Sequence, residues 1–231
     1  MNDLRAAIAD ALRYCDDNGV EIPIDILLSA RVKGIKAGNV AGDLSSINSV
    51  YHDRITKILT DYFEGGNLRS LSNAFKRAVI ESFGSAFDQG WMDGGQELPV
   101  DDTALTWFKA RVEEEFGHVE MLFQQAKELR GEEGFDFFEW VSARADGYTN
   151  TLKELYNAGR LRAMKDQMVT FDGDDGEESC PDCQRLKGSR HKISWFVKRN
   201  YVPPFGTGLE CHPGGRCQHG LMDDGGNWVT V

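Results

Sequence analysis

The sequence predicts a mainly α protein, with a multi-helix body over residues 1–168 and a small C-terminal α+β subdomain over residues 169–231. Two observations predict this division. Apolar residues recur at three- and four-residue spacing through the first 168 residues, as they do on the buried face of an amphipathic helix. After Met168 that spacing stops, and cysteine, glycine and proline become frequent, which is typical of short strands and loops stapled by a metal ion.

The body begins with two helices predicted within residues 1–42. The first carries the apolar face from Leu4 to Cys15, and Cys15 is expected to be one of its small buried residues. The second follows Pro23 and is weakened by glycines. Asp43 is the candidate N-cap of a longer third helix, which Gly65-Gly66 ends.

A fourth helix is predicted where large apolar residues repeat with almost unbroken four-residue steps until Gly94-Gly95. A ladder of this kind is expected to be core or a helix–helix seam. Its members are Leu68, Leu71, Phe75, Val79, Phe83, Phe87 and Trp91.

Two further long helices complete the body. The fifth follows the start signal Asp101-Asp102-Thr103 and ends at Gly131, with residues 113–115, three consecutive glutamates, expected on a solvated face. The sixth carries the apolar stripe from Phe135 to Tyr156 and has a basic end, which suits the negative end of the helix dipole. Beyond it, residues 168–171 and 228–231 are predicted strands, and residues 172–178 are a predicted solvated acidic loop.

Four of the five cysteines and three of the five histidines lie between Cys180 and His219. Residues 180–183 form a CxxC, whose two thiols can turn toward one ion. The second pair of ligands would come from four candidates: Cys211, His212, Cys217 and His219. A structural Zn2+ is therefore predicted, with Cys180, Cys183, Cys211 and Cys217 as the favoured ligands and His219 as the substitute.

The site is predicted to be structural because a tail of about sixty residues buries too little apolar surface to fold firmly alone. Two disulfides, unrelated thiols and a redox CxxC are the alternatives, although no strand–helix context typical of a redox motif is visible. No nucleotide-binding, hydrolase or HExxH motif is present, so no enzymatic activity is predicted.

Charge is distributed unevenly along the chain, whose net charge is -11. Residues 180–231 carry 7 basic and 4 acidic residues, a balance of +3, so the first 179 residues carry -14. Six basic residues without an acidic neighbour are concentrated after the CxxC: Arg185, Lys187, Arg190, Lys192, Lys198 and Arg199. They would bind phosphates or an acidic partner, or else balance the acidic segment 172–178.

No run of apolar residues is long enough to span a membrane, so no membrane partner is expected. The N-terminus lacks the basic and apolar regions of a signal peptide, and the protein is expected to start in the cytosol.

The order of motifs near the C-terminus resembles the minor head, or head-morphogenesis, proteins of tailed bacteriophages, the family typified by phage Mu protein F. The motifs are a helix ending Leu155-Tyr156-Asn157-Ala158-Gly159-Arg160, the segment Cys180 to Gly188, Pro203-Pro204, and a closing segment from His212 to His219. The likeness covers about sixty residues, and five residues separate Cys211 from Cys217 where the family pattern has three.

The resemblance implies a structural virion protein, assembled in the bacterial host cytoplasm near the portal vertex, with portal and capsid proteins as partners and no catalytic activity. The basic run would also allow contact with DNA. A zinc-stabilised nucleic-acid-binding module is the alternative function.

Overall fold

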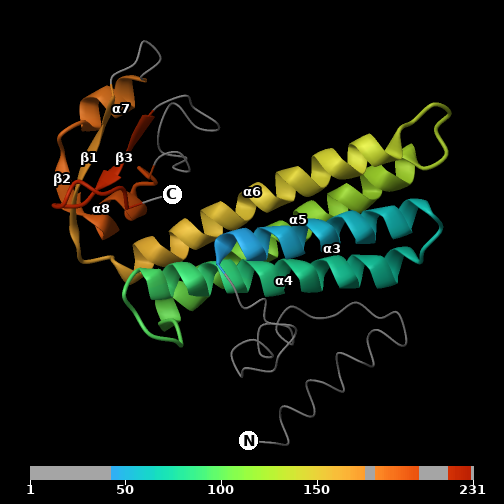
Figure 1. Ribbon diagram of the computed structural model, residues 1–231, viewed down its shortest axis with the longest axis horizontal. Helices are drawn as coiled ribbons and strands as arrows, with labels where there is room; N and C mark the ends of the chain where they lie inside the picture. The colour runs from blue at the N-terminus through green and yellow to red at the C-terminus, as the bar shows by residue number, and fades with distance from the viewer. Residues whose placement is uncertain (1–42, 175–179, 203–217, 230–231) are drawn as a thin grey trace, which may run out of the picture. The chain divides into compact units, whose positions relative to one another are not determined.

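The computed structural model describes residues 43–174, 180–202 and 218–229. That part of the chain is mainly helical, with a small three-stranded antiparallel sheet near the C-terminus (Figure 1). The predicted mainly helical class with a small C-terminal sheet is therefore confirmed. The two helices predicted within residues 1–42 lie outside the described residues. The elements are α3 (Leu44–Phe63), α4 (Leu68–Asp93), α5 (Asp102–Leu129), α6 (Phe137–Ala163), β1 (Met168–Asp174), α7 (Pro181–Leu186), β2 (Arg190–Lys192), α8 (Ile193–Lys198) and β3 (Gln218–Met222).

The chain divides into two compact units, and both α4 and α6 contribute residues to each of them. Unit 1 comprises residues 1–86 and 99–152, and unit 2 comprises residues 87–98 and 153–231. The division predicted from the sequence, at residues 168 and 169, lies inside unit 2.

Two of the long helices have aspartate N-caps at the positions that the sequence predicts. The Asp43 carboxylate accepts a hydrogen bond from the Ser46 N–H at 2.8 Å, and Asp101 accepts one from the Ala104 N–H at 2.8 Å. Each bond satisfies one of the N–H groups that the first turn of a helix leaves unpaired. The predicted starts of α3 and α5 are confirmed.

Aromatic residues form the core of unit 1, where α3, α4, α5 and α6 lie lengthwise against one another (Figure 1). The ladder predicted on α4 is buried from Phe75 onward, which confirms it as core. Its rings meet rings of the neighbouring helices edge-to-face: Tyr51 with Phe83 at 6.1 Å, and Phe75 with Phe123 at 5.9 Å.

One of the three glutamates expected in solvent is buried. Glu115 is only 3% exposed, and its carboxylate lies 3.0 Å from the Arg111 guanidinium. The prediction of a solvated face holds for the exposed Glu113 and Glu114, but it is wrong for Glu115. Successive residues of a helix are rotated by about 100° around its axis, so one of three consecutive side chains points toward the core. The cation one turn earlier, Arg111, neutralises the charge of the buried carboxylate.

In unit 2 the backbones of α4 and α6 touch. A Cβ atom added to Gly90 would lie 1.9 Å from the Tyr156 carbonyl oxygen, and one added to Gly159 would lie 2.1 Å from the Phe87 carbonyl oxygen. Such distances leave no room for any side chain, so glycine is required at both positions. Beside this crossing the Tyr156 hydroxyl donates a hydrogen bond to the Asp93 carboxylate at 2.7 Å.

The sheet of unit 2 has β1 in the centre, with β2 and β3 antiparallel on either side. Sequence patterns predict β1 through Phe171 only, but the strand continues to Asp174 because residues 172–174 pair with β3. Of the predicted strand at residues 228–231, the described residues form one isolated β-bridge, between Met222 and Trp228. The unit has its own core: Leu161, Val169, Phe171, Cys183, Leu186, Ile193, Phe196, Val202, Leu221 and Val229.

The α4–α6 contact makes a prediction about two glycines of one helix. Gly159→Ala should lower the free energy of unfolding by about 1–3 kcal/mol, because the new methyl group forces the two backbones apart. Gly147→Ala is the matched control, since nothing lies within 4 Å of its added Cβ. That variant should gain about 0.5–1 kcal/mol from its better helix propensity. Urea unfolding followed by circular dichroism measures both, and equal effects would contradict the close contact.

Tyr156 makes the protein less stable at alkaline pH. Burial and then the hydrogen bond to Asp93 raise the pKa of Tyr156 to about 12, from an ordinary value of 10.0. The folded state therefore favours the protonated phenol, and this stabilisation is complete below pH 10 and lost as the pH rises from 10 toward 12. Urea unfolding between these pH values should show a steeper loss for the wild type than for Tyr156→Phe. If the free energy of unfolding fell equally with pH in both proteins, Tyr156 would not be the cause of the pH dependence.

Candidate functional site

The CxxC of the sequence lies at the start of a short helix. Cys180 is the N-cap of α7, and its sulfur accepts a hydrogen bond from the Cys183 N–H at 3.4 Å. Pro181 occupies the first turn, where a missing N–H costs nothing. Cys183 is fully buried in the core of unit 2, and Cys180 packs against that core.

His219 lies on β3, opposite Gly173 of β1. Its imidazole is 6% exposed and stacks on the Phe171 ring, with centroids 5.8 Å apart and the planes inclined by 25°. The aromatic core of unit 2 thus holds this ring in place. The other downstream candidates, Cys211, His212 and Cys217, lie outside the described residues.

The prediction of a structural zinc ion is corrected by the structure. Across residues 43–174, 180–202 and 218–229, no three His, Cys, Asp or Glu side chains come together in an arrangement that could hold a metal ion. Cys180, Cys183 and His219 are described, and they form no such group. The zinc prediction assumed that the tail buries too little apolar surface to fold firmly alone. Unit 2 instead has an apolar core of ten buried residues, and nine of them come from residues 169–231.

Three of the six basic residues are paired with aspartates of the same unit. Arg185 lies 2.8 Å from Asp182, Arg190 binds both oxygens of Asp224 at 2.8 Å, and Lys192 lies 2.9 Å from Asp166. None of these three partners belongs to the acidic segment 172–178. Hydrogen bonding to Asp182, and then to Tyr201, raises the pKa of Arg185 above its ordinary value.

Lys198 and Arg199 differ from that group. Both are exposed at the end of α8, and neither forms an ion pair with any residue that the structure describes. These two charges are therefore available to an anionic partner. Lys187, at the C-terminal end of α7, is exposed as well.

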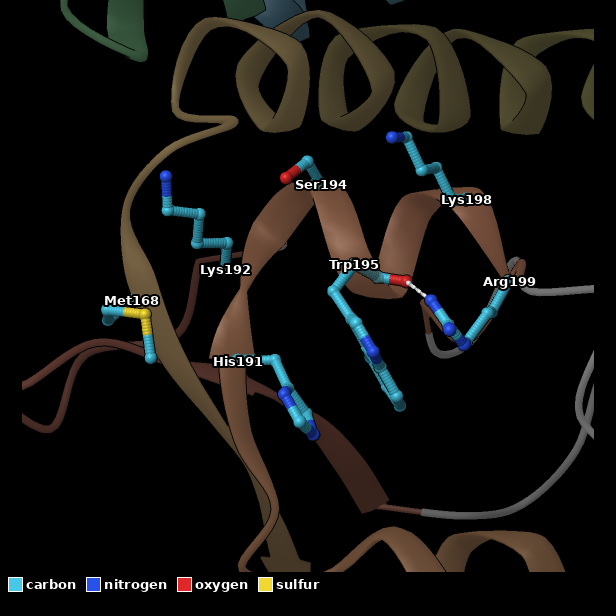
Figure 2. A pocket seen from close by; sticks show the side chains of 7 residues that line it. All are labelled: Met168, His191, Lys192, Ser194, Trp195, Lys198 and Arg199. Carbon is cyan, nitrogen blue, oxygen red and sulfur yellow. Dashed lines mark hydrogen bonds between the residues drawn. The ribbon is translucent and has the colours of Figure 1, made fainter.

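A surface pocket of about 590 Å³ lies beside these cations (Figure 2). Its lining combines positive charge with aromatic rings, and comes from the start of β1, from β2 and from α8. The lining residues are Met168, His191, Lys192, Ser194, Trp195, Lys198 and Arg199.

Three side chains of this pocket form a ladder, seen edge-on in Figure 2. The His191 and Trp195 rings are nearly parallel, 3.9 Å apart and inclined by 15°, and the Arg199 guanidinium lies 4.2 Å from the Trp195 centroid. Arg199 also donates a hydrogen bond to the Trp195 carbonyl at 3.3 Å, which orients its guanidinium. The ladder combines ring stacking with a cation–π contact.

The sequence-predicted basic run contains Arg199 but neither ring of the ladder. The four-residue spacing of Trp195 and Arg199 matches one turn of a helix and could have suggested their contact, whereas His191 lies on β2 and no helical spacing predicts its position. The cations and stacked rings of the pocket are groups that can bind an anion or a nucleic-acid base.

None of the helices in the described part of the chain combines the length and apolar character needed to cross a bilayer. Comparison with family models, with curated proteins and with solved structures found no match to this chain.

Proposed function

We propose that the chain is a structural and assembly protein of a tailed-phage particle, a minor capsid or head-morphogenesis protein acting near the portal vertex, without catalytic activity. Portal and capsid proteins are its proposed partners, and the assembled virion is its proposed location. The proposal rests on the pattern of residues from Cys180 to His219 and on the likeness of that pattern to the head-morphogenesis family.

One observation supports treating the first part of that pattern, from Cys180 to Gly188, as part of a folded unit. Cys183 is fully buried and Leu186 is 3% exposed, and both belong to the core that β1 and α8 share. The segment from Cys180 to Gly188 is therefore held in a defined shape, as a docking element requires. Binding through such an element should depend on Leu186, because this buried side chain holds the segment in shape.

The test compares Leu186→Asp with Gln184→Asp in heads assembled from co-expressed portal and capsid proteins. Gln184 is an exposed residue of the same helix. The wild type and Gln184→Asp should sediment with the heads, whereas Leu186→Asp should be lost, because a carboxylate in this core disrupts it. Quantitative mass spectrometry of the gradient fractions gives the readout. A wild-type chain absent from the heads would refute the proposal.

A second candidate function is nucleic-acid binding by unit 2, which the ladder of His191, Trp195 and Arg199 favours. Proteins that bind single strands combine cations along the backbone path with aromatic rings beside the bases. The pocket has both, and Lys198 and Arg199 are among the residues that line it.

This candidate is tested with a labelled oligothymidylate over a salt series. Lys198→Gln/Arg199→Gln should weaken binding and reduce the slope of log K against log salt by about 1.4, since about 0.7 counterions are released per phosphate contact on a single strand. Arg185→Gln/Arg190→Gln is the control with the same change of net charge, and its effect should be smaller because both residues have aspartate partners and neither lines the pocket. Trp195→Ala should also weaken binding. Equal effects of the two double variants would exclude this site.

A further inference from the structure

Five aromatic rings gather at one end of unit 1, where α3 ends and α6 begins. The Phe63 ring lies 5.7 Å from Phe135, 5.3 Å from Phe137 and 5.6 Å from Trp140, measured between centroids. The rings of Phe137 and Phe138 are 4.0 Å apart. We call these five residues the aromatic tip.

The aromatic tip is not part of the core. None of its rings is buried, and Phe138 is 63% exposed, whereas Phe75 and Phe83 of the same unit are fully buried. The four other rings are partly buried, and the exposed part of the cluster forfeits the hydrophobic free energy that full burial would supply. Contiguous apolar surface on a folded protein marks an interaction site, and aromatic anchors dominate the energy of such sites.

The local structure fixes the position of these rings. The Asp136 carboxylate accepts hydrogen bonds from the N–H groups of Phe138 and Glu139, at 3.0 and 3.1 Å, and so caps the start of α6. Phe137 and Phe138 therefore lie in a regular first turn. The connections α3–α4 and α5–α6 emerge at the same end of the helices, which brings Phe63 to the start of α6 (Figure 1).

Negative charge surrounds the aromatic tip. Residues 128–139 contain five acidic residues and one basic residue, Arg130, a balance of -4. Four of the acids are exposed and form no ion pair with any described residue: Glu132, Glu133, Asp136 and Glu139. The nearby arginines face rings, with Arg130 lying 5.1 Å from the Tyr62 centroid and Arg144 lying 5.4 Å from that of Trp140.

This charge decides between the possible occupants. An anionic lipid surface would be repelled by the acidic residues. A second copy docked through the same tip would bring together two segments with a net charge of -4 each, which repel one another. A protein segment with apolar side chains between lysines and arginines fits both features, because its cations meet the carboxylates while its apolar side chains cover the rings.

We propose that the aromatic tip, with its rim at residues 132–139, is a docking surface for a basic amphipathic helical segment of another protein. The surface belongs to unit 1 and does not use the Cys180 to His219 pattern, so the proposal stands or falls independently of the phage-particle proposal.

The test uses the full chain and two labelled synthetic peptides. One is an amphipathic helix with leucine and phenylalanine on one face and lysine on the other, and the second carries glutamate in place of lysine. Fluorescence anisotropy at low salt should show the lysine peptide binding at least about tenfold more tightly than the glutamate peptide. That preference should shrink at about 0.5 M salt, where exposed charges are screened.

Two pairs of variants locate the binding. Phe138→Ala should weaken binding of the lysine peptide about tenfold, as truncation of an interface anchor does. Met121→Ala, which removes an apolar side chain of α5 that is 57% exposed, should leave binding unchanged. Glu132→Gln/Glu133→Gln should weaken binding more than Glu113→Gln/Glu114→Gln, the same charge change on α5. Thermal melts of all four should match the wild type.

Equal binding of the two peptides, or unchanged binding by Phe138→Ala, would overturn the proposal. Sedimentation of the chain alone tests whether the partner is a second copy. If the wild type is a dimer that Phe138→Ala dissociates, and the lysine peptide does not dissociate it, the aromatic tip would be a self-association surface instead. Flotation with vesicles of anionic phospholipid should show no binding, and flotation that depends on Phe138 would likewise contradict the inference.

Discussion

The backbone contact between α4 and α6 at Gly90 and Gly159 is the constraint on which unit 2 depends. Glycine at both positions lets two helices approach until the carbonyl of one touches the Cα of the other. The contact fixes the end of α6, which carries Leu161 into the core of unit 2 and leads within a few residues to the central strand β1. The sheet is therefore attached to a helix pair that side-chain packing and a Tyr156–Asp93 hydrogen bond hold in register.

Unit 2 explains why the reasoning that led to zinc failed. A tail counted from residue 169 is small and glycine-rich, and a metal ion is the usual remedy for a chain that buries too little apolar surface. This tail nevertheless supplies nine of the ten buried residues of the unit's core, and α6 adds the tenth, Leu161. Cys183 contributes to this core as a small apolar residue. A CxxC at the start of a helix is then compatible with a structural role in packing and capping.

Two exposed surfaces combine aromatic rings with charge, and the sign of the charge differs between them. The ladder of unit 2 stands beside Lys198 and Arg199, whereas the aromatic tip of unit 1 stands among glutamates and Asp136. Rings supply contact area to almost any partner, so the charges around them select its class. An anionic partner suits the first surface and a cationic one the second.

The sequence by itself determined the long helices α3 to α6, because apolar periodicity, aspartate caps and glycine stops are local signals. It also located the basic run and the start of β1. Only the tertiary structure decided that β1 continues to Asp174, that Glu115 is buried, and that Arg190 and Lys192 are paired with aspartates distant in the sequence. The two aromatic surfaces were also decided by the tertiary structure, since they depend on which side chains meet after folding. Strand pairing and ion pairs between distant residues are set by the path of the whole chain, and no short window of sequence records that path.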